Sequence, residues 1–375
     1  MKIEQSHWSP AAGWQHRDGS LEGRPAQFVL AFGGRHLLED PAHYAGLAAR
    51  HPGAHIILAS TSGEISGSEI TEDELTVTAV ALERTSVRCA EAAITASRDS
   101  RALGAELAGR LQGPDLAHVF VISDGSFTNG TELARGLNSN LPAGVLVTGG
   151  LAGDGARFEK TLVGLDGPPA PGRVVALGFY GKSFRSSFGS AGGWMPFGPE
   201  RLVTRSDGNR LLELDGCSAL ALYRQYLGDQ AAGLPGTALR FPLSLSPADG
   251  SPTVVRTTLS IDEAAQSMTF AGDIPEGARV RFMHASYEDV LDGAAQAAEQ
   301  TGARAPELVI CVSCVGRRLV LGQRTEEELE QVRDYVGPQA VLAGFYSYGE
   351  LAPAGREAGC LLHNQTMTIT AFAEA

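Results

Sequence analysis

A strand that ends in an acidic turn occurs three times in the chain, and this repeat constrains the fold more than any other feature. Each copy is an apolar run followed by a Gly/Ser-rich turn: IILASTSGE (56–64), VLVTGGLAGD (145–154) and VLAGFYSYGE (341–350). The runs end in Glu64, Asp154 and Glu350, and a glycine precedes each acid. Because an internal repeat decides the architecture of a chain, the repeated unit is the basis for predicting the fold.

A helix is predicted upstream of each acidic turn. The three segments are 40–53, 129–144 and 325–338. Asp40 followed by Pro41 is a typical helix start, because Asp caps free backbone N–H groups and Pro has none to lose. Thr325 and Glu328 have the spacing of a capping box. Two further helices are expected at 101–113, which Asp99 or Ser100 would cap, and at 286–302, which Ser286 would cap.

Short apolar strands complete each unit. They are expected before the helices at 27–34, 118–125 and 307–316, and after the acidic turns at 75–82, 173–181 and 366–373. The unit therefore reads strand, helix, strand, acidic turn, strand. Unbroken apolar strands are usually covered on both faces, so we predict a layered α/β (α+β) fold in which helices pack on mixed β-sheets.

The chain is long enough for two domains. Its 375 residues exceed the roughly 250–300 at which single cores stop growing. The segment WMPFGPE (194–200) interrupts the apolar pattern with two prolines and two aromatic residues. We therefore predict an N-terminal tail over 1–22 and two halves over 23–193 and 194–375.

Charge and hydropathy exclude several classes of partner. The net charge of −13 argues against nucleic acid and anionic membranes, which are bound by clustered Lys and Arg. No apolar run reaches the ~18 residues of a membrane span, and the N-terminus lacks the apolar segment of a signal peptide. Five scattered cysteines do not form a disulfide framework. We expect a soluble, cytoplasmic protein with reduced thiols.

Several motifs occur in the same order as in one known family. They are STSGEI (60–65), SDG (123–125), TGGLAGD (148–154), ELDGCSALALYRQYLG (213–228), SCVGR (313–317), GFYSYGELAP (344–353) and LHNQTMT (362–368). Together they resemble the FIST family, the F-box and intracellular signal transduction proteins, over about residues 27–373. The resemblance implies a cytosolic sensory protein that binds a small ligand. It also implies signalling through a separate partner such as a histidine kinase or a cyclic-dinucleotide enzyme.

Haem is the alternative ligand that the resemblance suggests, because some stand-alone members of similar length are haem-binding nitric oxide sensing proteins. Haem iron needs an axial ligand such as a histidine from an apolar pocket, and His284 and His363 lie in apolar strand contexts. A lone strand histidine is, however, more often a satisfied core residue. The family commonly carries Gly-Cys where this chain has Leu58-Ala59, so a ligand contact through that cysteine does not transfer.

The predicted ligand-binding residues come from the acidic turns and one family motif, because ligands of α/β sheets gather at loops beyond strand ends. They are Ser60, Thr61, Ser62, Glu64, Gly149, Gly150, Asp154, Tyr346, Ser347, Tyr348, Glu350 and Asn364. The aromatic faces and hydroxyls of this set suit a small polar or amphiphilic ligand. A purely structural role stays open, since glycine permits positive φ and an acid can cap a neighbouring N–H.

Catalysis and metal binding have little support in the sequence. The chain contains no GxSxG, HExxH, GxxxxGK[ST] or helix-opening GxGxxG signature. Cys311 and Cys314 are three apart in a predicted strand, so they point to opposite faces and chelate poorly. We therefore do not expect an enzyme. The catalytic alternative uses Glu64, Asp154 or Glu350 as a general acid or base, which requires one of them in a cleft with a raised pKa.

Overall fold

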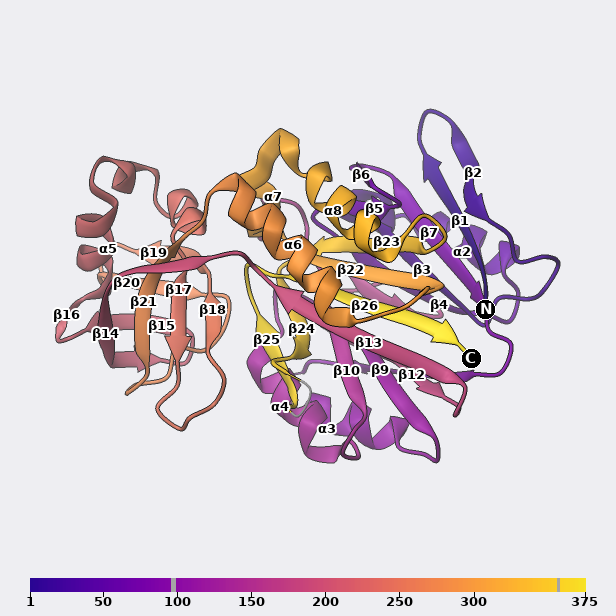
Figure 1. Cartoon of the computed structure of the whole chain (residues 1–375), viewed down its shortest axis with the longest axis horizontal. Coiled ribbons are helices and arrows are strands. Elements are labelled where there is room, and N and C mark those ends of the chain that lie inside the picture. The colour runs from indigo at the N-terminus through magenta and orange to yellow at the C-terminus, as the bar shows by residue number, and fades with distance from the viewer. Residues whose placement is uncertain (96–98, 356–357) are drawn as a thin grey trace.

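The computed structural model describes residues 1–95, 99–355 and 358–375 (Figure 1). It confirms the predicted α/β class: helices cover mixed β-sheets. The first repeat unit contains β3 (Phe28–Gly33), β4 (His55–Ser60) and β7 (Leu75–Ala81), with α1 (Arg35–Leu38) and α2 (Pro41–Arg50) between its first two strands. Strand β3 lies between a parallel β4 and an antiparallel β7.

The other two units repeat this arrangement strand for strand. The second contains β9 (Leu116–Ser123), α4 (Gly130–Asn140), β10 (Leu146–Leu151) and β12 (Arg173–Tyr180), and the third contains β22 (Leu308–Cys314), α7 (Val315–Leu321), α8 (Glu326–Val336), β23 (Val341–Ser347) and β26 (Met367–Glu374). In both units the first strand again lies between a parallel second strand and an antiparallel third strand. The sequence repeat is therefore a repeat of structure.

The three sheets enclose one common core. Phe32 from the first sheet, Phe120 from the second and Phe345 from the third belong to the same buried cluster. The opposite face of each sheet packs on helices: α2 on the first sheet, α3 (Ser100–Leu111) and α4 on the second, and α6 (Tyr287–Thr301) and α8 on the third. Strands buried on both faces explain the unbroken apolar runs of the sequence.

The units interlock because each acidic turn sends the chain into a neighbouring sheet. After the first turn, β5 (Glu64–Ser66) pairs with β23 of the third unit. After the third turn, β24 (Gly349–Pro353) pairs with β10 of the second unit, and after the second, β11 (Val163–Leu165) pairs with β4 of the first. This cyclic exchange brings all three acidic turns to the same end of the core.

Six further strands of the described chain extend these sheets. They are β1 (Lys2–Ser9), β2 (Gly13–Gly19), β6 (Glu69–Thr71), β8 (Ser86–Ala93), β13 (Phe184–Ala191) and β25 (Cys360–His363). Residues 2–19, which we expected to lie in a tail, form β1 and β2, and β1 pairs with β7 along its length. The two predicted halves also share a sheet, because β13 pairs with β26.

A separate subdomain lies between β13 and α6, at the left of Figure 1. It contains β14 (Met195–Asp207), β15 (Arg210–Leu214), β16 (Cys217–Ser218), α5 (Ala219–Leu227), η1 (Gly228–Gly233), η2 (Gly236–Arg240), β17 (Leu243–Ser246), β18 (Val254–Arg256), β19 (Thr258–Asp262), β20 (Ser267–Phe270) and β21 (Arg279–His284). Its own core includes Tyr223 and Phe282. The pattern break at residue 194 marks the start of this subdomain, and the division of the chain at residue 193 into two family domains stays a prediction.

Most predicted helix caps are present, and one is wrong. Asp40, Asp99 and Ser286 accept backbone N–H groups at the starts of α2, α3 and α6. Thr325 makes no side-chain cap: its own backbone is helical and its hydroxyl donates to the Gly322 carbonyl across η3 (Gly322–Arg324). Glu328 turns into the protein interior instead, where Arg317 holds it. Within the described residues, no helix has the length and apolar character needed to cross a bilayer.

Candidate functional site

The three acidic turns contact one another directly. Three backbone hydrogen bonds join them: Ser62 N to Tyr346 O (2.9 Å), Gly153 N to Ser60 O (3.0 Å) and Tyr348 N to Leu151 O (3.1 Å). The three acids are all buried, with Glu64 1% exposed and Asp154 and Glu350 fully enclosed. The fold thus gathers the repeated acids of the sequence in one region, although each acid has its own set of partners.

Glu64 and Glu350 share one arrangement. The hydroxyl of the residue three positions earlier donates to the carboxyl group: Thr61 to Glu64 at 2.5 Å and Ser347 to Glu350 at 2.7 Å. Glu350 also accepts the hydroxyl and the N–H of Thr366, at 2.9 and 3.2 Å. Burial raises the pKa of each acid to about 8, and the hydrogen bonds offset only part of this rise. Both side chains are therefore predominantly protonated and neutral at pH 7.

Asp154 has a different set of partners from the other two acids. It accepts the N–H groups of Phe158, Glu159 and Lys160 at 2.9, 3.2 and 3.0 Å, and it forms an ion pair with Arg35 at 3.0 Å. The Tyr348 hydroxyl also donates to it. Asp154 thereby fixes the loop that follows β10.

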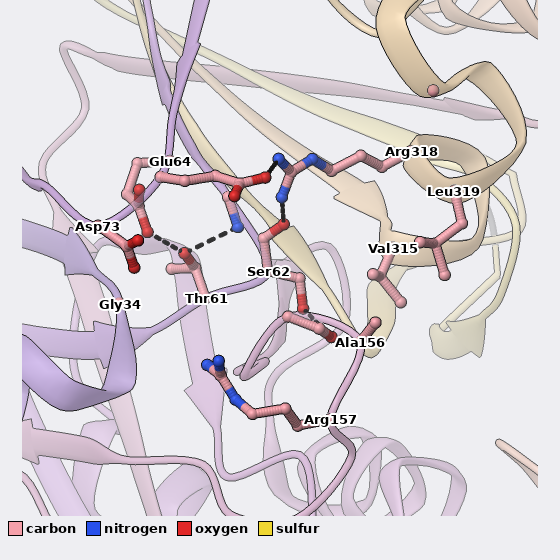
Figure 2. Close-up of a pocket in the computed structure, with 14 residues that line it drawn as sticks. Gly34, Thr61, Ser62, Glu64, Asp73, Ala156, Arg157, Val315, Arg318 and Leu319 are labelled. Carbon is pink, nitrogen blue, oxygen red and sulfur yellow. Dashed lines mark hydrogen bonds and ion pairs between the residues drawn. The ribbon is translucent and has the colours of Figure 1, made fainter.

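A cavity of about 450 Å³ opens beside the first acidic turn (Figure 2). Its walls come from all three repeat units: Gly34, the first turn and residues 72–73 of the first, the loop after the second turn, and α7 with the following Gly322 of the third. The lining residues are Gly34, Thr61, Ser62, Gly63, Glu64, Glu72, Asp73, Gly155, Ala156, Arg157, Val315, Arg318, Leu319 and Gly322. We call this space the Arg318 cavity. Its volume falls in the range of small-molecule sites.

Arg318 is the central cationic side chain of this cavity. Its guanidinium donates to the Ser62 carbonyl and pairs with Glu72, and it lies 5.6 Å from the centre of the Tyr346 ring. Burial lowers its pKa, but an arginine stays charged at neutral pH. Figure 2 shows Arg157 on the opposite side of the cavity from Arg318, with Val315 and Leu319 on the α7 side.

Some residues predicted from the turns line the Arg318 cavity and others lie beneath it. Thr61, Ser62 and Glu64 line it, whereas Ser60 is buried and accepts the Leu162 N–H at 2.8 Å. Gly149 and Gly150 lie inside β10. A Cβ on Gly149 would stand only 1.9 Å from the Val121 carbonyl oxygen, so close strand packing accounts for this glycine.

Residues of the third turn are absent from the lining of the Arg318 cavity and pack behind it. Tyr346 is fully buried, and its hydroxyl donates to Glu328 at 2.5 Å. Tyr348 lines a different cavity, described below. Asn364 is fully buried, and neither side-chain amide atom has a hydrogen-bond partner in the structure. It is absent from the lining of the Arg318 cavity.

Sequence reasoning missed Arg318 and Arg157, the two cations of the site. A signal for Arg318 was present, since it directly follows the SCVGR motif (313–317). That motif places α7 against the first turn only through the exchange of β5 into the third sheet. Arg157 follows the second acidic turn by three residues, in a loop whose path Asp154 determines.

The two histidines proposed for haem do not fit an axial ligand as they stand. His284 is exposed at the end of β21, beside Phe197. His363 is buried, but its Nε2 is bonded to the Ala352 carbonyl oxygen at 3.0 Å, and burial lowers its pKa to about 4. Neither residue lines the Arg318 cavity. Across residues 1–95, 99–355 and 358–375, no group of three or more His, Cys, Asp or Glu side chains is placed to hold a metal ion.

Two family models match consecutive parts of the chain. The family model of the FIST N domain matches residues 27–217, and that of the FIST C domain matches residues 219–353. The chain belongs to the FIST family. FIST domains are small-ligand-sensing domains of signal transduction. A search of curated proteins gave no match to this FIST protein.

Proposed function

We propose that this FIST protein is a sensor whose small ligand occupies the Arg318 cavity. The observation that carries the proposal is the convergence of the first turn, the loop after the second turn and α7 around one cavity. A ligand in that position contacts all three repeat units at once. Its binding would therefore favour one relative arrangement of the units over another, which is how a ligand shifts a conformational equilibrium.

The lining favours a small polar molecule with both acidic and basic groups. Arg318 and Arg157 can receive a carboxylate, because guanidinium groups bind carboxylates with paired hydrogen bonds. Asp73 offers an exposed carboxylate to an ammonium group, and the protonated Glu64 can donate a hydrogen bond. Val315 and Leu319 supply an apolar wall on one side. Free amino acids have this combination of groups and are small enough to enter the cavity.

A binding screen tests the proposal. Thermal unfolding is measured with a panel of amino acids and polar metabolites, and a ligand at 100 times its Kd stabilises the native state by about 2.7 kcal/mol. Arg318→Ala should abolish the shift. Arg324→Ala is the matched control, because Arg324 also pairs with carboxylates near α7 but is absent from the cavity lining. A panel without any stabilising compound, or equal loss in both variants, would refute this site.

The output of the sensor is proposed to pass to a separate protein such as a histidine kinase or a cyclic-dinucleotide enzyme. In support of this, two adjacent residues of α7 connect the Arg318 cavity to the buried interior of the protein. Arg318 reaches the cavity, whereas Arg317 is fully buried and bonds to Glu328, to the Val290 carbonyl and to the Gly192 carbonyl. Gly192 lies in the link to the subdomain. Co-purification of a kinase or cyclase with wild-type protein, but not with Arg318→Ala, is the expected result.

The absorption spectrum of freshly purified protein separates a colourless ligand from haem. Under the proposal, added haem gives no saturable Soret band. A saturable band that shifts with nitric oxide and disappears in His284→Ala or His363→Ala would support the haem alternative instead.

One observation favours a catalytic role for Glu64, namely a carboxyl group with a pKa of about 8 in the wall of a cavity. This second candidate function makes a distinct prediction. Any compound found in the screen should be converted to product over time by wild-type protein and not by Glu64→Gln. A compound recovered unchanged after prolonged incubation supports sensing without catalysis.

A further inference from the structure

A second cavity, of about 510 Å³, lies between the second repeat unit and the subdomain. We call it the Phe127 cavity. One wall comes from the loop that joins β9 to α4, a second from Tyr348 and the loop after β10, and a third from β19, β20 and the residues after β20. This arrangement matches that of the Arg318 cavity: in both, an acidic turn of one unit faces the segment that follows the first strand of another unit.

The chemistry of the two cavities differs. Where α7 brings Arg318 to the first cavity, the β9–α4 loop brings Phe127 to the second, and the Phe127 side chain is 60% exposed. Phe158 and Leu259, also exposed, stand in the same lining. Three large exposed apolar side chains around one hollow are unusual on a soluble protein, and such groupings mark binding sites.

Phe158 is held in position by its backbone conformation, by the hydrogen bonds of its N–H group and by a stacked ring. Its φ of +55° is a left-handed conformation that bulky side chains rarely adopt. Its N–H donates to Asp154 and to the Tyr348 hydroxyl, at 2.9 and 3.0 Å. The Phe158 and Tyr348 rings stack, with centroids 4.6 Å apart and ring planes 18° apart. A strained residue kept in place by buried partners is characteristic of a functional site, and here it fixes an aromatic face at the cavity.

The polar groups of this cavity are mostly uncharged. Ser126 and Ser260 present hydroxyl groups that can bond to the edge of a ligand. Asn209, whose Nδ2 donates to the Phe270 carbonyl oxygen at 2.7 Å, presents its amide oxygen. Glu159 is the charged side chain among the described lining residues, and it is already paired with Arg35 at 3.3 Å. A charged ligand would lose hydration without gaining a free opposite charge. The cavity therefore favours a neutral molecule.

We propose that the Phe127 cavity binds a neutral, planar aromatic molecule with a hydrogen-bonding group at its edge, stacked against Phe158 and Phe127. Aromatic rings attract one another beyond the gain from buried area alone. The volume accommodates one or two fused rings. This site is separate from the Arg318 cavity and does not depend on what that cavity holds, although residues 155–157 line the first and 158–159 line the second.

The test is a ligand-detected NMR titration of the full chain with indole, phenol and cyclohexanol. Phenol and cyclohexanol carry the same hydroxyl group and number of carbons, and only phenol is planar and aromatic. We expect saturable binding of indole, and phenol bound at least ~5-fold more tightly than cyclohexanol. Cyclohexanol bound as tightly as phenol would overturn the proposal, because the cavity would then recognise apolar volume alone.

Variants locate the site. Phe127→Ala should weaken indole binding about 10-fold, and its exposure leaves folding unaffected. Phe158→Asn removes the second ring but keeps a residue that tolerates positive φ. Leu319→Ala is the matched control: it removes an exposed apolar side chain from the Arg318 cavity and should leave indole binding unchanged. The proposal fails if indole does not bind, if both phenylalanine variants bind it normally, or if Leu319→Ala weakens it equally.

Discussion

Replacement of Glu350 by glutamine should make the stability of the protein less dependent on pH. Burial raises the pKa of Glu350 from 4.5 to about 8 in the folded protein. Between these values the folded state keeps a proton that the unfolded state has lost. The free energy of unfolding therefore falls by about 1.4 kcal/mol for each pH unit through that interval. Glu64 has a similarly raised pKa and contributes the same slope.

The effect is best measured between pH 6.5 and 8, because at lower pH the buried histidines change the free energy of unfolding in the opposite direction. Burial lowers the pKa of His118 to about 3 and that of His363 to about 4. Both are neutral when folded but protonate when unfolded below pH 6.5, so they make stability rise with pH in that lower range. Above pH 6.5 this opposition declines, because an unfolded histidine is half protonated at pH 6.5 and almost fully neutral by pH 8. Between pH 6.5 and 8 each raised acid costs about 1.6 kcal/mol and the two histidines together recover about 0.8 kcal/mol, so wild-type protein should lose about 2.5 kcal/mol.

Glu350→Gln should therefore lose only about 1 kcal/mol over the same range. A glutamine has the same shape, its carbonyl oxygen can accept from Thr366, and its amide can donate to the Ser347 hydroxyl oxygen. The assay is urea unfolding followed by tryptophan fluorescence at pH 6.5, 7.25 and 8.0 and constant ionic strength. Glu263→Gln, at an exposed carboxylate paired with Arg224, is the control and should keep the wild-type slope. Equal slopes in wild type and Glu350→Gln would refute the assignment of a neutral buried acid.

Two further predictions concern residues that support the site. Arg317→Met leaves Glu328 buried without its ion-pair partner and should destabilise the fold by about 3–5 kcal/mol, whereas Arg317→Met combined with Glu328→Leu should be markedly more stable in urea unfolding. An Arg317→Met protein as stable as wild type would contradict this prediction. Gly344→Ala should cost several kcal/mol, since φ is +152° and a Cβ would stand 1.8 Å from the Cys311 carbonyl oxygen. Gly109→Ala, in open space on α3, should instead gain up to about 1 kcal/mol, and similar thermal shifts for both variants would show the packing argument to be wrong.

Local features of the sequence determined the repeat unit. Apolar runs with β-branched residues specify strands buried on both faces, and Asp40, Asp99 and Ser286 specify helix starts through hydrogen bonds that span two or three residues. The order of strand, helix, strand, turn and strand could be read for all three copies because each step depends on neighbours within a few positions. The family resemblance came from the same short motifs, and both family models confirm it.

The tertiary structure alone decided what each acidic turn does. Nothing local shows that β5, β11 and β24 cross into neighbouring sheets, because strand exchange depends on pairing between residues more than 100 positions apart. That exchange buries Glu64 and Glu350 as neutral acids and surrounds Asp154 with N–H donors. Thr325 lost its expected capping role because its own backbone is helical, and Glu328 is bonded to the buried Arg317 instead. The sequence thus placed the acids at strand ends, and long-range packing buried them, kept Glu64 and Glu350 neutral and assembled the cavity around Arg318.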